Sequence, residues 1–251
     1  MGFALIGSIF IGASLGLLGS GGSVFTVPLL VFFLQRPEKL AIAESMAIVG
    51  SCALAGSIPY FFRKQIQWKS VLFFGIPGMV GACIGGWGTY FVSGSSQLTL
   101  FGFAMLASSG AMLFGPLNME KFFIFEKSIW MTIIEGFLIG CLTGFIGVGG
   151  GFLIVPALAF LCLLPLQFAI GTSLVIIAMN SLIGFFMQSI ALKAMEMHVD
   201  WRLIAVIAMG GILGSFTAGI AAKNISQVRL RKVFGYGVLV MGFYVLSHSF
   251  I

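Results

Sequence analysis

The sequence predicts an all-α polytopic membrane protein made of two inverted-topology repeats, each a broken or re-entrant helix hairpin followed by three transmembrane helices. Three observations predict it. The chain of 251 residues is 59% hydrophobic and 8% charged, with a mean hydropathy of +1.14, whereas soluble domains carry about 25% charged residues. Its apolar residues fall into long segments, and one glycine-rich pattern occurs in both halves.

Ten hydrophobic segments can be drawn, five in each half. A helix needs about 20 apolar residues to cross a bilayer, and the third, fourth and fifth segments of each half have that length. Each second segment is short, so the first two segments predict a hairpin, either re-entrant or fully crossing. The segments are residues 3–18, 24–34, 40–62, 70–92 and 98–114, then 129–146, 152–164, 166–192, 203–222 and 233–249.

The two halves match over nearly the whole chain, which indicates a duplication. We assign the first transmembrane repeat to residues 1–117, a cytoplasmic linker to 118–128 and the second repeat to 129–251. The offset between matched residues is 128 and becomes 133 after a loop insertion. Matched pairs include Gly12 and Gly140, Pro37 and Pro165, and Ser45 and Ser173 at the first offset, and Gly78 and Gly211, and Phe101 and Phe234 at the second.

Basic loops predict that the repeats have opposite orientations. Arg63, Lys64 and Lys69 lie between the third and fourth segments of the first half, whereas the second half has its basic cluster at residues 223–232, between its fourth and fifth segments. Basic loops stay cytoplasmic, so equivalent loops face opposite sides. The linker is then inside and both termini are outside, in a multi-pass protein of the cell (inner or plasma) membrane. Chance clustering of a few charges is the alternative.

The glycine-rich pattern predicts a helix break at membrane depth. Glycine permits positive φ and close backbone approach, and non-helical backbone survives in a membrane only around a buried or water-filled cavity. A helix that starts after such a turn directs N–H groups and its positive dipole end at an anion. The candidate substrate-binding residues are Gly19, Ser20, Gly21, Gly22 and Ser23 in the first copy and Gly147, Gly149, Gly150 and Gly151 in the second.

We expect the two turns to meet near the bilayer midplane as one anion cradle, because broken helices at matching places of two repeats are typical of transporter sites. The alternative is that the glycines only allow helices to pack closely. That alternative is preferred for the small-residue pairs elsewhere, which are Gly12 with Gly16, Gly140 with Gly144, Gly81 with Gly85, and Gly210 with Gly214.

Polar residues of the third segment in each half are further candidates. Glu44 has no Lys or Arg within a segment to neutralise it, and charged groups at depth usually mark ion or proton pathways. We therefore consider it a proton-coupling candidate, the alternative being a protonated or interfacial carboxyl. Ser45 and its counterparts Thr172 and Ser173 are expected to flank the cradle. Asn180, near the bilayer centre, suits either substrate contact or interhelical hydrogen bonding.

Other classes of function find no support in the residues. The four cysteines lie in apolar segments without metal-ligand spacing, and no catalytic constellation is present, so we expect neither an enzyme, a metal site nor a cofactor. The net charge of +6 comes from short loops, which does not indicate nucleic-acid binding. The expected partners are a small anion and the lipid bilayer, and homo-oligomer formation is left open.

The duplicated motif resembles that of the TauE/SafE sulfite exporter family. The second copy, from Gly147 to Pro156, matches the pattern Gly-x-Gly-Gly-Gly followed by proline, and the first departs from it at Ser23. The resemblance implies a secondary transporter of sulfur-containing anions such as sulfite or organosulfonates, exporting by alternating access. The rival readings are an anion channel and a non-transporting membrane scaffold or assembly factor.

Overall fold

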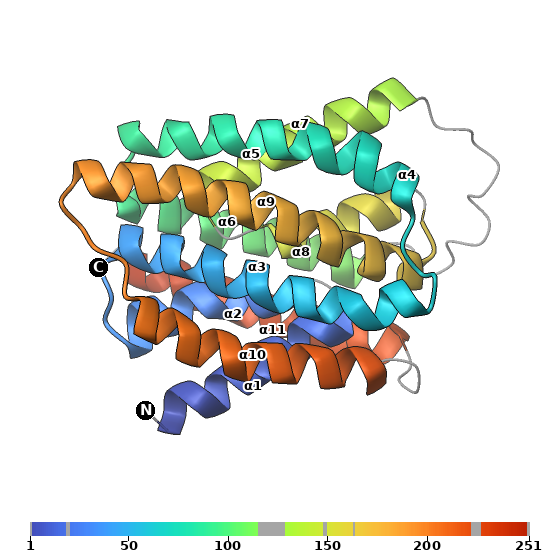
Figure 1. Ribbon diagram of the computed structural model, residues 1–251, viewed down its shortest axis with the longest axis horizontal. Coiled ribbons are helices and arrows are strands. Elements are labelled where there is room, and N and C mark those ends of the chain that lie inside the picture. Colours follow the sequence, from blue (N-terminus) through green and yellow to red (C-terminus); the bar gives the residue numbers. More distant parts are fainter. Residues whose placement is uncertain are drawn as a thin grey trace.

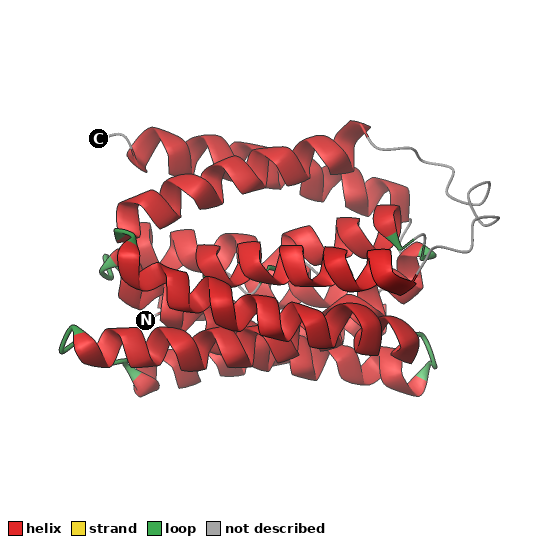
Figure 2. Cartoon of the chain, turned by 90° about the horizontal axis from the view of Figure 1, so that it is seen from above, coloured by secondary structure: helices red, strands yellow, loops and turns green. Residues whose placement is uncertain are grey.

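The protein is a bundle of roughly aligned helices (Figure 1). The structure, a computed structural model, describes residues 2–18, 21–114, 129–147, 150–162, 164–221 and 227–249, and contains no strand within these ranges (Figure 2). Six described helices are long and apolar enough to cross a membrane. Large apolar side chains such as Phe62, Trp130 and Leu213 are exposed on the outside, as lipid contact requires. The all-α polytopic membrane fold is thereby confirmed.

The helices follow the predicted segments closely. The greatest departure is α11, which starts six residues early because it includes the polar stretch from Gln227 to Lys232 that hydropathy leaves out. The first half contains α1 (Gly2–Leu18), α2 (Gly21–Pro28), η1 (Leu29–Phe33), α3 (Glu38–Phe62), α4 (Trp68–Ser70), η2 (Val71–Gly75), α5 (Ile76–Gly88), η3 (Thr89–Phe91) and α6 (Gly94–Phe114). The second contains α7 (Ile129–Ile146), α8 (Gly151–Pro156), η5 (Ala157–Leu161), α9 (Leu166–Ala194), α10 (Trp201–Ala221) and α11 (Gln227–Ser249).

Both short second helices end in the same way. Pro28 and Pro156 lack the N–H that an α-helix needs, and the chain continues as one π-helical turn after each. These turns close with hydrogen bonds of 3.1 Å from Leu34 N–H to the Leu29 carbonyl and from Cys162 N–H to the Ala157 carbonyl. The two halves thus share a local irregularity as well as a sequence pattern.

The segment formed by α2 and η1 runs back along α1. A Cβ on Gly22 would lie 2.6 Å from the Ile11 carbonyl oxygen, and one on Gly7 would lie 3.0 Å from Leu29. From Gly21 to Phe33 the returning arm has 13 residues, about 20 Å at 1.5 Å per residue, less than the hydrocarbon thickness of about 30 Å. Because the arm returns along α1, α1 and α3 start on the same side of the bundle (Figure 1).

Helices of one half pack mainly on helices of the other. The closest pairs are α1 with α10, α5 with α7, α3 with α9 and α6 with α11. A Cβ on Gly12 would overlap the Gly211 carbonyl, and one on Gly140 would overlap the Gly78 carbonyl. Each glycine therefore allows backbones to touch, which confirms the predicted packing role.

Those two contacts are equivalent under the duplication, with the halves exchanged. The matched helices α3 and α9 also run antiparallel, because a Cβ on Gly184 would meet Met46 whereas one on Gly171 would meet Tyr60. Opposite directions of matched helices are what an inverted repeat requires. The arrangement supports that prediction.

Candidate functional site

The second glycine-rich copy forms a turn inside the bundle. Helix α7 ends at Ile146 and α8 begins at Gly151, so the predicted helix break is present. Gly147 has φ of 77° and Gly150 has φ of 68°, in the left-handed region that favours glycine. Val148 and the candidate Gly149 lie outside the described residues.

Space as well as conformation requires glycine in this turn. A Cβ on Gly147 would overlap the side chain of Ile42 on α3, and one on Gly150 would overlap Thr143 on α7. Because a buried turn is held this tightly by its surroundings, the polar groups that reach it have defined positions.

Three uncharged polar side chains surround the turn. The Ser45 hydroxyl lies 2.7 Å from the Ile42 carbonyl oxygen and 3.5 Å from that of Gly147. Gln97 Nε2 donates to the Phe145 carbonyl at 2.9 Å. Gln188 Nε2 lies 3.1 Å from the place of a Cβ on Gly147. Ser45 was predicted, whereas both glutamines were missed, although Gln188 lies within an apolar segment as Asn180 does.

Glu44, the neighbour of Ser45, is held in an ion pair. It is fully buried and binds Arg36 through both carboxylate oxygens, at 2.6 Å to Nη2 and 3.2 Å to Nε. It also accepts the backbone N–H of Asp200 at 3.0 Å. The hydrogen bond to Glu44 raises the pKa of Arg36 above its ordinary value. The cation comes from the loop before α3. This loop lies outside the apolar segments, so the absence of Lys and Arg within the segments did not indicate that Glu44 has a cationic partner.

This ion pair gives Glu44 a structural role. Its bonds fix the start of α3 to the loop before α10. Proton coupling by Glu44 stays a prediction, and a proton would have to displace Arg36 to reach it.

The first glycine-rich copy differs from the prediction. Gly19 and Ser20 lie outside the described residues, and α2 begins at Gly21, so Gly22 and Ser23 are helical. Gly22 shows no positive φ and faces Ile11 and Leu15 of α1. The expectation that Gly22 is a turn residue is therefore wrong, because its small size serves helix packing.

The single midplane cradle is also wrong, because the two breaks lie near opposite ends of α3. Ser45 is beside Gly147, whereas the Tyr60 hydroxyl donates to the carbonyl of Gly16, near the end of α1, at 3.0 Å. Fifteen residues of α3 separate Ser45 from Tyr60, about 22 Å along the helix. The two hairpin tips therefore lie apart along α3.

The remaining candidates lie away from the second turn. Thr172 accepts the backbone N–H of Gln67 at 2.9 Å, and the Ser173 hydroxyl donates to the Ile170 carbonyl at 2.8 Å, both at the far end of α9. Buried Asn180 lies eight residues before Gln188, about 12 Å along α9, where α5 meets α7. The structure thus brings together Ser45, Gly147, Gly150 and Gly151.

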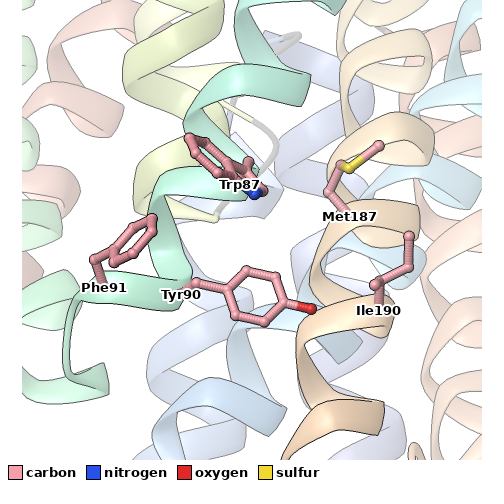
Figure 3. Close-up of a pocket in the computed structure, with 5 residues that line it drawn as sticks. All are labelled: Trp87, Tyr90, Phe91, Met187 and Ile190. Atoms are coloured by element: carbon pink, nitrogen blue, oxygen red, sulfur yellow. The ribbon is translucent and has the colours of Figure 1, made fainter.

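A separate cavity of about 420 Å³ lies between the end of α5 and α9 (Figure 3). Its lining is aromatic and aliphatic, and Trp87 is 61% exposed, as aromatic side chains at a membrane interface are. It offers an anion few donors, so we do not place the substrate there. The lining residues are Trp87, Tyr90, Phe91, Met187 and Ile190.

Helix α8 has six residues, too few for a substantial dipole, so hydrogen-bond donors must come from the turn and its side chains. The polar side chains beside the described part of the turn are uncharged, and the nearby Glu44 is paired with Arg36, which also lies 3.8 Å from a carboxylate oxygen of Asp200. The site is therefore a buried, uncharged polar region beside a glycine turn.

Comparison with known proteins agrees with this architecture. Residues 4–245 match the family described as Sulfite exporter TauE/SafE. A probable membrane transporter protein of Xylella fastidiosa is 32% identical over 245 residues, covering 95% of this chain and 92% of the relative. The probable membrane transporter protein YunE of Bacillus subtilis is 29% identical and covers 79% and 80%. No solved structure matches the chain. The chain therefore belongs to the TauE/SafE sulfite exporter family of membrane transporters.

Proposed function

We propose that the protein is a secondary transporter that exports a small sulfur-containing anion, such as sulfite or an organosulfonate, across the cell membrane. The observation that carries the proposal is the buried helix break at Gly147–Gly150, with its left-handed glycines and the adjacent Ser45. Such a break at membrane depth is tolerated around a cavity or ion pathway. The family description supplies the sulfur-containing substrate class.

The direction of transport follows from the charge of the substrate. An inside-negative potential favours the exit of a monoanion by about 2.3 kcal/mol per 100 mV, so export needs no further energy source. The inverted arrangement proposed for the repeats suits alternating access. In that mechanism, movements of the α1–α2 and α7–α8 hairpins open the site alternately to the two sides of the membrane.

Counterflow in proteoliposomes tests this function. We expect labelled sulfite to enter vesicles faster when they are preloaded with unlabelled sulfite, and the rate to saturate. A saturable exchange distinguishes a transporter from a channel, whose flux is not stimulated by counter-substrate. Protein-free vesicles and the Gly150→Ala variant are the controls. Absence of sulfite and sulfonate flux from correctly inserted protein would refute the proposal.

A further inference from the structure

Two buried carboxamides at the second turn have hydrogen-bonding atoms without a partner. Gln97 is 0% exposed and Gln188 is 2% exposed. Gln97 Oε1 and Gln188 Nε2 have no hydrogen-bond partner in the structure and no contact with solvent. Buried polar atoms in native proteins are nearly always paired with protein, water or ligand, so these two require an explanation.

The two atoms differ in kind. Gln97 Nε2 donates to the Phe145 carbonyl, and the opposite amide orientation would set two acceptors against each other, so its free atom is the acceptor Oε1. No hydrogen bond to a described residue fixes the amide of Gln188, so it can present the donor Nε2 toward Gly147, as it does in the structure. The turn is therefore flanked by one free acceptor and one free donor.

A fully ionised oxyanion matches this pair only in part, because it can accept from Gln188 but has no hydrogen for Gln97 Oε1. An oxyanion that keeps one proton matches it: an unprotonated oxygen accepts from Gln188 and the O–H donates to Gln97. Charge favours the same form. The cost of removing an ion from water grows with the square of its charge, so a dianion costs roughly four times as much as a monoanion beside a turn whose described polar neighbours Ser45, Gln97 and Gln188 are uncharged.

We propose that Gln97 and Gln188 select the singly protonated monoanion of a weak oxyacid, such as hydrogen sulfite, over its dianion. This inference rests on the proposed function and specifies the ionic form that the site carries.

Titratable groups on the surrounding elements have to be separated from the substrate's own proton. They are Arg36, Glu38, Lys39 and Glu44 before and on α3, Lys193 on α9, and Glu196, His198 and Asp200 before α10. Methanesulfonate is a monoanion at every accessible pH and has no O–H. Its transport therefore reports any pH effect that arises from the protein.

The test measures initial rates in proteoliposomes at fixed total sulfite while pH is raised through the second dissociation of sulfurous acid. We expect the sulfite rate to fall in proportion to hydrogen sulfite while the methanesulfonate rate stays level. A sulfite rate that follows total sulfite would overturn the inference and leave the proposed function intact. Failure to transport either anion would instead count against the function.

Two variants assign the effect to the carboxamides. Gln97→Leu should raise KM for hydrogen sulfite about tenfold, as expected for one lost hydrogen bond, and should not raise KM for methanesulfonate, which has no hydrogen for Gln97 to accept. Gln188→Leu should raise KM for both anions. Gln167→Leu, at an exposed carboxamide on α9, the helix that also carries Gln188, is the matched control. If both site variants leave each KM unchanged and alter only thermal stability, the carboxamides hold a structural water and the inference fails.

Discussion

The two ends of the α3–α9 pair are closed by equivalent hydrogen bonds of different chemistry. At one end the Asp200 N–H donates to Glu44, and at the other the Gln67 N–H donates to Thr172, at 3.0 and 2.9 Å. Glu44 and Thr172 are 128 positions apart, and Gln67 and Asp200 are 133 apart, which are the two offsets of the duplication. The two hydrogen bonds occupy equivalent positions, but the acceptor is a charged carboxylate at one end and a neutral hydroxyl at the other.

The difference indicates that the two ends do not open at equal cost. Glu44 is a buried carboxylate that also binds Arg36, and bonds to ionised groups are roughly twice as strong as neutral ones. Thr172 offers a neutral hydroxyl. We therefore expect the Thr172 end to open more readily, and the Glu44 end to be the firmer closure.

The largest expected effect concerns which side of the membrane each end of the α3–α9 pair faces. In a cysteine-free background, single cysteines at Ser95, near the Glu44 end, and Lys69, near the Thr172 end, should be labelled from opposite sides of the membrane. Asn224, which lies outside the described residues, should share the side of Lys69. Labelling of Lys69 and Asn224 from opposite sides would exclude inverted repeats.

The glycine turn beside the Glu44 end should be the next most sensitive. Gly150→Ala adds a Cβ at positive φ and against Thr143, so transport should be lost while the protein still inserts. Gly22→Ala and Gly12→Ala meet α1 and α10 respectively and should mainly lower thermal stability. Counterflow and thermal unfolding of all three variants check this. Full transport by Gly150→Ala would place the site elsewhere.

Replacing Glu44 tests the end of the α3–α9 pair that a charged acceptor closes. Glu44→Gln leaves Arg36 without its anion, and since Arg36 is 25% exposed and can turn to water, we expect unfolding to become easier by about 2 kcal/mol. The hydrogen bond to Glu44 raises the pKa of Arg36, so its contribution is complete throughout the neutral range and is lost only at strongly alkaline pH, and this stability should be constant near neutral pH. Thermal unfolding measures it.

The same variant decides the proton-coupling hypothesis. If Glu44 carries the coupling proton, Glu44→Gln should abolish any dependence of methanesulfonate transport on pH. A structural ion pair predicts lower stability with the pH profile unchanged, and that result would end the hypothesis.

The fold was predictable from the sequence to a greater extent than the site. Hydropathy, the glycine clusters and the prolines locate the long helices that the structure describes and both hairpins, because they act locally, although the division of residues 68–91 into shorter helices was not predicted. The site depends on which helices meet. Arg36 reaches Glu44 from a loop, and Gln97 reaches the α7 end from another helix. No local pattern records such contacts, and the assumption that matching turns converge failed because the two hairpin tips lie at different levels of α3.

The smallest effect should come from the Thr172 end of the α3–α9 pair, where the acceptor is a neutral hydroxyl. Thr172→Val keeps the shape of the side chain and removes the acceptor of the Gln67 N–H, a loss of about 1 kcal/mol for one neutral hydrogen bond. The Glu44→Gln and Thr172→Val variants should therefore differ about twofold in their effect on unfolding. If the Thr172 end is the one that opens in each cycle, Thr172→Val should also leave the transport rate equal or faster, because opening it costs less. Thermal unfolding and initial transport rates of both variants, measured in the same lipid, make the comparison. Equal destabilisation by the two substitutions would show that the charge at Glu44 adds nothing to the closure.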